Sequence, residues 1–206
     1  FHSWCPPQAA FVAADEMGFY LQVEGSCWAA FGDGTALGTW IYAEIDRMIR
    51  AYGNHPSFCF FSPSNEPSGR NRDRFLGRLL TDLKAKDNRR FYVAGAGWPQ
   101  IPENEYSIEQ AVRLQRWPTL RFDRPPQTFD DYRSHVEARP IPVVGHEIGQ
   151  WCAYPDLAEE SQYRGVLKAR NMAIFRDKLE KAGMGHLARD FLMASGRFQT
   201  LLYKQE

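Results

Sequence analysis

Two glutamates stand where a hydrophobic segment turns abruptly polar. Glu66 follows the apolar run of residues 57–61 in "SFCFFSPSNEP", and Glu147 follows "PIPVV" in "PIPVVGHEIGQW". A third, Glu24, ends the segment "GFYLQVEG" at 18–25. Carboxyl groups brought by separate strands to one sheet edge can work as a pair, in which one donates a proton and the other attacks or activates water. We expect Glu66 and Glu147 to form such a pair, and Glu24 to orient other groups.

The segments between these glutamates alternate between strand and helix patterns. The expected strands cover residues 18–25, 57–61, 90–97 and 140–151; the expected helices cover 6–18, 36–54, 72–87 and about 128–138, with more helices in 157–206. Strands separated by helices predict a parallel sheet, and strands that are apolar throughout are typical of a sheet covered on both faces. Trp40 belongs to the apolar repeat of the helix at 36–54 and is expected in the core.

Composition limits the classes of function. The chain has 206 residues, 44% of them hydrophobic, which is enough for a substantial core. Lys+Arg and Asp+Glu are both 25, so the charge balance argues against a partner that is nucleic acid or an anionic membrane. No apolar run approaches the roughly 18 residues of a membrane span. No GxSxG elbow and no phosphate-binding glycine-rich loop is present, which argues against other hydrolases and transferases.

The four cysteines are scattered and form no CxxC pair. Their spacing does not suggest a metal site, and Cys59, inside an apolar strand, is expected to be a buried free thiol. The sequence leaves open whether any of the four forms a disulfide.

Several of these motifs together resemble the catalytic domain of glycoside hydrolase family 2, in clan A of the glycosidases. "SPSNEP" at 62–67 resembles the Asn-Glu pair after the fourth strand, and "VVGHEIGQW" at 143–151 resembles the nucleophile segment after the seventh. Residues 1–25 and "NHPSF" at 54–58 are similar to the second-to-third-strand region and the approach to the fourth strand. The resemblance covers essentially the whole chain.

The resemblance implies roles for the residues at these motifs. Glu66 would be the general acid/base and Glu147 the nucleophile of a retaining double displacement. Asn65 would bind the sugar 2-hydroxyl, and His2 would line the sugar subsite. His146 would either contact the substrate or point back into the barrel wall.

Other residues have two readings. Trp4, Trp28 and Trp151 would stack on sugar rings or simply pack. The residue that orients the nucleophile is unassigned, because the tyrosine that precedes the nucleophile in much of the clan has no clear counterpart; Tyr154 and Tyr106 are the candidates.

The implied activity is that of an exo-acting β-glycosidase, β-galactosidase-like, on an oligosaccharide or a plant polysaccharide side chain. The sequence departs from the Cys-Glu-Tyr pattern of the best-known β-galactosidases at "GHE" and "WCAYP", so β-glucuronidase and β-mannosidase remain alternatives, as does a non-catalytic carbohydrate-binding barrel. No cofactor is expected, although relatives use Mg²⁺ or Na⁺ near the site.

The implied fold is an α/β (β/α)8 TIM barrel. A whole barrel takes about 250 residues, so residues 1–206 are expected to be one partial barrel domain with strands two to seven present, the first and eighth missing, and no second domain. The parent protein is expected to be bacterial, periplasmic or secreted, with additional β-sandwich domains.

Overall fold

The computed structural model describes residues 1–32, 34–110, 129, 131–149 and 152–206. The chain divides into two compact units. The first contains Phe1–Val112 and Tyr132–His146, and the second contains Arg113–Asp131 and Glu147–Glu206. The two units are described separately below.

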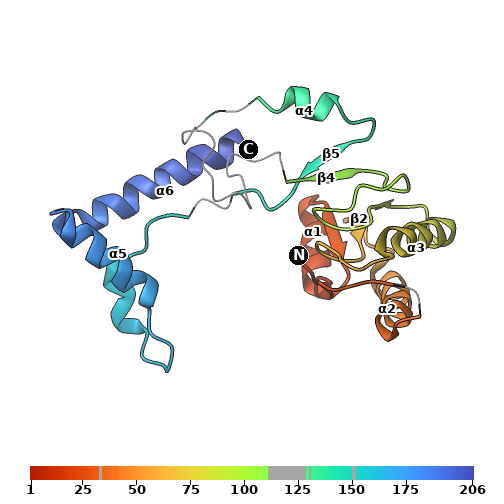
Figure 1. Cartoon of the computed structure of the whole chain (residues 1–206), viewed down its shortest axis with the longest axis horizontal. Helices are drawn as coiled ribbons and strands as arrows, with labels where there is room; N and C mark the ends of the chain where they lie inside the picture. Colours follow the sequence, from red (N-terminus) through yellow and green to blue (C-terminus); the bar gives the residue numbers. More distant parts are fainter. Residues whose placement is uncertain (33, 111–128, 130, 150–151) are drawn as a thin grey trace. The chain divides into compact units, whose positions relative to one another are not determined.

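The first unit begins with three helices that alternate with three strands. The helices are α1 (Gln8–Met17), α2 (Ala36–Tyr52) and α3 (Arg72–Lys86), and the strands are β1 (Leu21–Glu24), β2 (Phe58–Ser62) and β3 (Phe91–Tyr92). The strands form one parallel sheet in the order β1-β2-β3. Figure 1 shows the three helices gathered around the strands of this sheet. The predicted alternation of strands and helices is therefore confirmed in this part of the chain.

Local sequence explains where these helices begin, end and pack. The hydroxyl of Thr35 accepts a hydrogen bond from the N–H of Gly38 at 3.0 Å and caps the start of α2. Gly18 ends α1 in the left-handed conformation, which costs glycine little. The buried faces of α2 and α3 join Phe11, Val23 and Phe61 in one hydrophobic core. This core holds the ends of β1 and β2 in place.

One apolar position of α2 does not belong to that core. Trp40 is 38% exposed, so the prediction that it is buried is wrong. Ile41 and Ile45 are fully buried instead, at a spacing of four residues. A helix turns about 100° per residue, so the neighbour of a buried residue projects well away from its direction. The apolar repeat could not by itself separate the two neighbours Trp40 and Ile41.

A second, two-stranded parallel sheet completes the first unit. It pairs β4 (Ser107–Glu109) with β5 (Val143–Gly145), and the short helix α4 (Arg133–Glu137) precedes β5. Strand β4 falls in a segment where the sequence indicated only irregular structure. Strand β5 and helix α4 lie within the predicted ranges 140–151 and 128–138.

The predicted TIM barrel is wrong. The described residues form five strands in two separate sheets of three and two strands, and these do not close into a barrel. The reason is visible at β3, whose free edge is occupied by side chains and a turn rather than by another strand. The Glu105 carboxylate accepts from the N–H of Tyr92 at 3.0 Å, and the Asn104 side chain accepts from the N–H of Ala94 at 2.9 Å. These groups take the donors that a following strand would need.

The second unit is helical in its described part. It contains the 3₁₀ helices η1 (Leu157–Gln162) and η2 (Gly185–Leu187) and the helices α5 (Arg170–Lys181) and α6 (Ala188–Gln205). Met172 and Leu179 are buried at helical spacing, as the apolar pattern predicted. None of the described helices has the length and apolar character needed to cross a membrane.

None of the four cysteines forms a disulfide. Cys59 is half-buried, which fits the expectation of a free thiol except that it is less enclosed than predicted. Burial raises the pKa of Cys5 and of Cys27 to about 11. At neutral pH these two thiols stay protonated and are poor nucleophiles.

Candidate functional site

Glu66 is positioned by a strand pairing that continues beyond the end of β2. Asn65 and Ala96 form a parallel bridge, and the N–H of Glu66 donates to the carbonyl of Ala96 at 2.9 Å. The N–H of Ala96 in turn donates to the carbonyl of Ser64 at 2.9 Å. These bonds fix the backbone of Glu66 at the carboxyl end of the three-stranded sheet, where parallel α/β folds place their sites.

Both candidate glutamates have an unusual backbone conformation. Glu66 has φ of 42° and Glu147 has φ of 48°, and the only other described non-glycine residue with positive φ is Ser3. A non-glycine residue in this region costs about 1–3 kcal/mol and persists where the surrounding structure holds it, often at functional sites. The shared conformation therefore sets these two glutamates apart from the other acidic residues that the structure describes.

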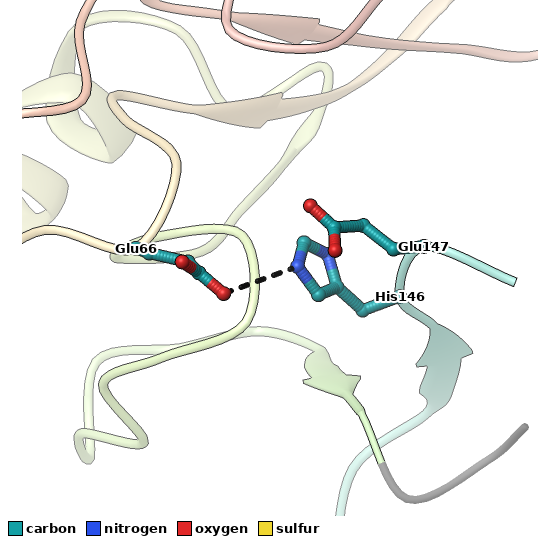
Figure 2. Close-up of side chains that lie close together, drawn as sticks. All are labelled: Glu66, His146 and Glu147. Atoms are coloured by element: carbon teal, nitrogen blue, oxygen red, sulfur yellow. Dashed lines mark ion pairs between the residues drawn. The ribbon is translucent and has the colours of Figure 1, made fainter. Parts of the chain in front are cut away.

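The side chain of Glu66 meets two polar partners from the second sheet. Its Oε1 accepts a hydrogen bond from Nε2 of Gln110 at 2.7 Å. Nε2 of His146 lies 3.9 Å from the same oxygen, and a dashed line marks this contact in Figure 2. Gln110 follows β4 directly and His146 follows β5 directly. The two-stranded sheet thus supplies the groups that contact the carboxylate at the end of β2.

His146 and Glu147 leave the end of β5 together. The N–H of His146 donates to the carbonyl of Glu109 at 3.0 Å, which extends the β4–β5 pairing by one residue. The imidazole is only 6% exposed. Glu147 is joined to His146 by a peptide bond, and one ligand atom each of Glu66, His146 and Glu147 lie within 4.8 Å of one another (Figure 2). Two carboxylates and one imidazole therefore converge.

Gly97 forms one wall of this group of side chains. A Cβ at position 97 would lie 3.1 Å from Nε2 of His146, 3.3 Å from Cγ of Glu66 and 3.4 Å from Nε2 of Gln110. The φ of Gly97 is +86°, which disfavours other residues. Both the space and the backbone angle therefore favour glycine here.

Asn65 lies directly before Glu66 and is 1% exposed. Its Oδ1 is buried and has no hydrogen-bond partner among the described residues. A buried carbonyl oxygen without a partner is rare and costs about 1–3 kcal/mol. This acceptor suits a donor brought by a ligand, such as a hydroxyl group.

A charged cluster beside β4 holds the second sheet in register. Oε1 of Glu109 accepts from Nε of Arg139 at 2.7 Å and from the hydroxyl of Ser107 at 2.5 Å. Burial would raise the pKa of Glu109, but the hydrogen bonds from Arg139 and Ser107 outweigh it and hold that pKa below its ordinary value. Glu109 is therefore ionised at neutral pH and serves to place Gln110, its neighbour, beside Glu66.

The Glu24 side chain contacts residues near it in the first unit. It ends β1, is 5% exposed, and accepts hydrogen bonds from the backbone N–H of Ser3 and, at 2.9 Å, from Nε2 of Gln22. These contacts tie the N-terminal segment to β1, and the expectation that Glu24 orients other groups stays a prediction. His2, in that segment, is exposed.

The predicted stacking tryptophans have different surroundings. Trp28 is 68% exposed on the loop after β1, and Trp4 is 64% exposed and lines a pocket of about 520 Å³ with Cys5 and Met48. The lining of that pocket does not include Glu66. Trp151 lies outside the described residues.

Both candidates for the residue that orients Glu147 have hydroxyls engaged elsewhere. The Tyr154 hydroxyl donates to the carbonyl of Phe175 at 3.1 Å, and its ring packs on Phe175 within the second unit. The Tyr106 hydroxyl donates to Oε1 of Gln22 at 2.9 Å, and burial raises its pKa well above the ordinary value. The residue that stands next to the two glutamates is instead His146.

Two site residues escaped the sequence analysis. Gln110 lies in a segment without apolar periodicity, and Gly97 ends a strand pattern where a glycine also fits an ordinary turn. Gln110 could have been predicted as a site residue only if "SIE" at 107–109 had first been recognised as a strand, because Gln110 directly follows that strand. Gly97 could have been noticed from its position, because it comes at the end of an apolar strand pattern, as Glu66 does.

The same three side chains could also hold a metal ion, because each offers one ligand atom. A first-row divalent ion binds such atoms at about 2.0–2.2 Å, so two ligands of one ion are at most about 4.4 Å apart. Atoms at the outer limit of 4.8 Å would need a small inward movement to share an ion.

Comparison of the sequence with protein-family models finds no matching family, and comparison with curated proteins finds no matching relative. The resemblance to glycoside hydrolase family 2 accordingly stays a prediction that rests on the motifs alone.

Proposed function

We propose that the chain carries the catalytic pair of a retaining, exo-acting β-glycosidase. Glu66 is the general acid/base and Glu147 is the nucleophile. The observation that carries the proposal is that one carboxylate oxygen of Glu66 and one of Glu147, which follow β2 and β5, lie within 4.8 Å of each other, with both backbones in the left-handed region. Retaining enzymes hold their carboxyl groups about 5–5.5 Å apart, whereas inverting enzymes need about 6.5–9.5 Å to admit a water molecule.

The first half-reaction uses both groups at once. A carboxylate oxygen of Glu147 bonds to the anomeric carbon while the bond from that carbon to the leaving oxygen breaks. Glu66 gives its proton to the leaving oxygen, which departs as a neutral hydroxyl. The products are the free leaving alcohol and a glycosyl ester of Glu147.

The second half-reaction reverses these roles. The Glu66 carboxylate takes a proton from water, and the water oxygen bonds to the anomeric carbon while the ester bond to Glu147 breaks. The sugar leaves with its original anomeric configuration, and both glutamates return to their starting states.

A β-galactoside is the preferred substrate class under this proposal, with β-glucuronides and β-mannosides as the alternatives. Asn65 supports a hydroxyl-rich ligand, because its buried Oδ1 has no hydrogen-bond partner among the described residues. A carbohydrate-binding protein without catalysis is the second candidate, and it would use the same acceptor.

Covalent trapping tests the proposal. The chain is incubated with the 2,4-dinitrophenyl 2-deoxy-2-fluoro-β-glycosides of galactose, glucuronic acid and mannose, and labelled peptides are mapped by mass spectrometry. We expect one of these reagents to add a single fluoroglycosyl group to Glu147. Glu147→Gln should abolish the label, and Glu16→Gln on the exposed face of α1 should retain it. A label on another residue would contradict the assignment of the nucleophile.

Turnover separates catalysis from simple binding. Glu66→Ala should slow glycosides with poor leaving groups far more than 2,4-dinitrophenyl glycosides, because only the former need the proton. Sugar binding by calorimetry with neither turnover nor trapping would instead identify a carbohydrate-binding protein.

A further inference from the structure

The backbone just after the proposed nucleophile turns sharply and is bound by the end of helix α6. Glu147 has φ of 48°, and Gly149, two residues later, has φ of 72°. The N–H of Gly149 donates to Oε2 of Glu206 at 2.5 Å, and the hydroxyl of Tyr203 donates to the carbonyl of Gly149 at 3.0 Å. Both backbone polar groups of Gly149 are therefore hydrogen-bonded to the end of α6.

The ring of Tyr203 also lies directly against Gly149. A Cβ at position 149 would overlap this ring, and the positive φ independently favours glycine there. Tyr203 is 50% exposed, so burial in a core does not explain where its side chain lies. Its contacts with Gly149 give it a specific place.

A second contact with α6 follows a few residues further along the chain. The N–H of Tyr154 donates to Oγ of Ser195 on α6 at 2.6 Å. Ser195 and Tyr203 are eight residues apart on this helix, which corresponds to about 12 Å. The segment after the nucleophile is thus anchored at two separate points of α6. All of these residues belong to the second unit, as does Glu147.

The contacts at Gly149 restrict the backbone of Glu147. On the other side of Glu147, the N–H of His146 donates to the carbonyl of Glu109 at 3.0 Å. The chain is therefore fixed one residue before Glu147 and two residues after it. A non-glycine residue with positive φ persists where the surrounding structure holds it, and these anchors are the contacts that do so here.

We infer that Tyr203 and Glu206 are positioning residues for the proposed nucleophile. They act through the backbone of Gly149 and keep Glu147 in the left-handed conformation, which sets the direction of its side chain. A nucleophile must be held in an attacking geometry, and a small displacement lowers the rate strongly. This inference rests on the proposed function for the role of Glu147, and it assigns the orientation of that residue to helix α6.

Hydrogen exchange of the Gly149 amide tests these contacts without requiring activity. NMR of the full chain compares the parent with Tyr203→Phe, which loses only the hydroxyl, and with Glu206→Ala, which loses the acceptor. We expect exchange at least about fivefold faster in each variant, because one hydrogen bond corresponds to about that factor. The controls are Tyr163→Phe, at a tyrosine that is 49% exposed, and Glu159→Ala, at an exposed position, and neither should change the exchange.

The rate of covalent trapping then measures the effect on Glu147. The reagent is the 2,4-dinitrophenyl 2-deoxy-2-fluoroglycoside that labels the parent chain. Tyr203→Phe and Glu206→Ala should slow ester formation at saturating reagent about fivefold to tenfold, while the reagent concentration that gives half the maximal rate stays within about twofold. Glu206→Gln keeps a carbonyl oxygen as acceptor and should restore most of the loss. A general weakening of the fold would not give this split between rate and affinity together with rescue by glutamine.

Two results would overturn the inference: unchanged exchange of the Gly149 amide in both variants, or faster exchange with trapping at the rate of the parent. Absence of labelling in the parent chain rejects the proposed nucleophile instead, and the exchange comparison then decides by itself whether α6 holds this turn. Far-ultraviolet circular dichroism and thermal unfolding show whether each variant is folded. Tyr203→Phe carries the test where Glu206→Ala is not folded.

Discussion

The two glutamates at the centre of the site, Glu66 and Glu147, both have a left-handed backbone conformation, which is uncommon for residues other than glycine. Each left-handed residue costs about 1–3 kcal/mol, which the surrounding structure must offset. For Glu66 the offset is visible in the hydrogen bond from its N–H to Ala96 and in the bridge between Asn65 and Ala96. The conformation turns the chain sharply after a strand, so that the carboxylate stands beside the second sheet rather than along the strand direction.

Gln110 is expected to control when Glu66 carries its proton. Its N–H donates to a carboxylate oxygen of Glu66 at 2.7 Å and so favours the ionised form. Gln110→Leu should move the alkaline limb of the kcat/KM pH profile upward, because the ionised form of Glu66 loses the hydrogen bond that favours it.

The measurement is the pH dependence of hydrolysis of an aryl glycoside. Gln8→Leu, on the exposed start of α1, is the control and should leave the profile in place. A Gln110→Leu profile of reduced height but unchanged limbs would mean that Gln110 supports the fold without influencing the proton on Glu66.

Gly97 is expected to be intolerant of any side chain. In Gly97→Ala the new methyl group meets His146 and Glu66 at 3.1 and 3.3 Å, and the φ of +86° is strained for alanine. Activity should fall at least about tenfold, and the free energy of unfolding should drop by about 1–2 kcal/mol.

Gly34→Ala separates the two causes. Gly34 has a similar φ of +74°, but a Cβ there meets nothing within 4 Å. It should lose about 1 kcal/mol of stability in urea unfolding and keep full activity. Equal loss of activity in the two variants would show that backbone strain, not contact with the glutamates, is what matters at position 97.

At the scale of elements, the decisive feature is the way the three-stranded sheet ends at β3. Glu105 supplies a side-chain acceptor to the N–H of Tyr92 in β3, and Asn104 supplies one to the N–H of Ala94, two residues after β3. A short strand whose outer backbone groups are already hydrogen-bonded has few unpaired N–H and C=O groups with which a further strand could pair. The chain therefore starts a new sheet with β4, and β5 joins β4 rather than the sheet of β1.

Asn104→Ala should reveal how much this edge contributes to stability. The N–H of Ala94 is fully buried, and loss of its acceptor leaves it unpaired. We expect the free energy of unfolding to fall by about 1–3 kcal/mol. Asn88→Ala, at an exposed position, should change it by less than about 0.5 kcal/mol. Urea unfolding followed by circular dichroism measures both, and similar values for the two would contradict the importance of this contact.

Elements with strong apolar periodicity were predicted well, whereas the short strand β4 was not predicted. Helices α2 and α3 lie within the predicted ranges, and strand β2 extends one residue beyond its range, to Ser62, because each contributes buried apolar residues to one core. Strand β4 was missed, because it has three residues and its sequence "SIE" mixes polar and apolar types. Its strand state comes from pairing with β5, a partner more than 30 residues later.

At the scale of the molecule, one buried ion pair makes the stability of the first unit depend on pH. Asp87 is 7% exposed, and it accepts from Nη2 of Arg89 at 2.8 Å and of Arg90 at 2.6 Å. The hydrogen bond from Arg89 outweighs burial and, with help from Arg90, holds the pKa of Asp87 well below its ordinary value. The guanidinium of Arg90 also lies 4.1 Å from the ring centre of Phe58 on β2.

The sign of the pH effect follows from the lowered pKa. Above the ordinary aspartate pKa of about 3.9 the carboxylate is charged in both folded and unfolded chains, and its stabilisation is fully present. As pH falls below that value, the unfolded chain takes up a proton first and the stabilisation is lost. Asp87→Asn should therefore cost about 3 kcal/mol at pH 7 and clearly less at pH 3.

Urea unfolding at pH 7, 5 and 3 measures this difference. The control is Asp73→Asn, since Asp73 pairs with Arg72 at the surface with 58% of its side chain exposed, and it should cost less than about 1 kcal/mol at every pH. A cost for Asp87→Asn that does not change with pH would mean that Asp87 acts through packing alone.

The sequence by itself determined the local elements around the first sheet and singled out Glu66 and Glu147, because apolar strands that end in polar residues are a local pattern; Asn65 and His146 were named through the resemblance to glycoside hydrolase family 2. Tertiary structure decided what these elements build. Two separate parallel sheets replaced the expected barrel, because side chains close the edge of β3. It also decided that Gln110 and Gly97 surround Glu66 and that Tyr106 and Tyr154 have other partners. Such contacts join residues tens of positions apart, and no local pattern records which distant groups will satisfy a given donor or carboxylate.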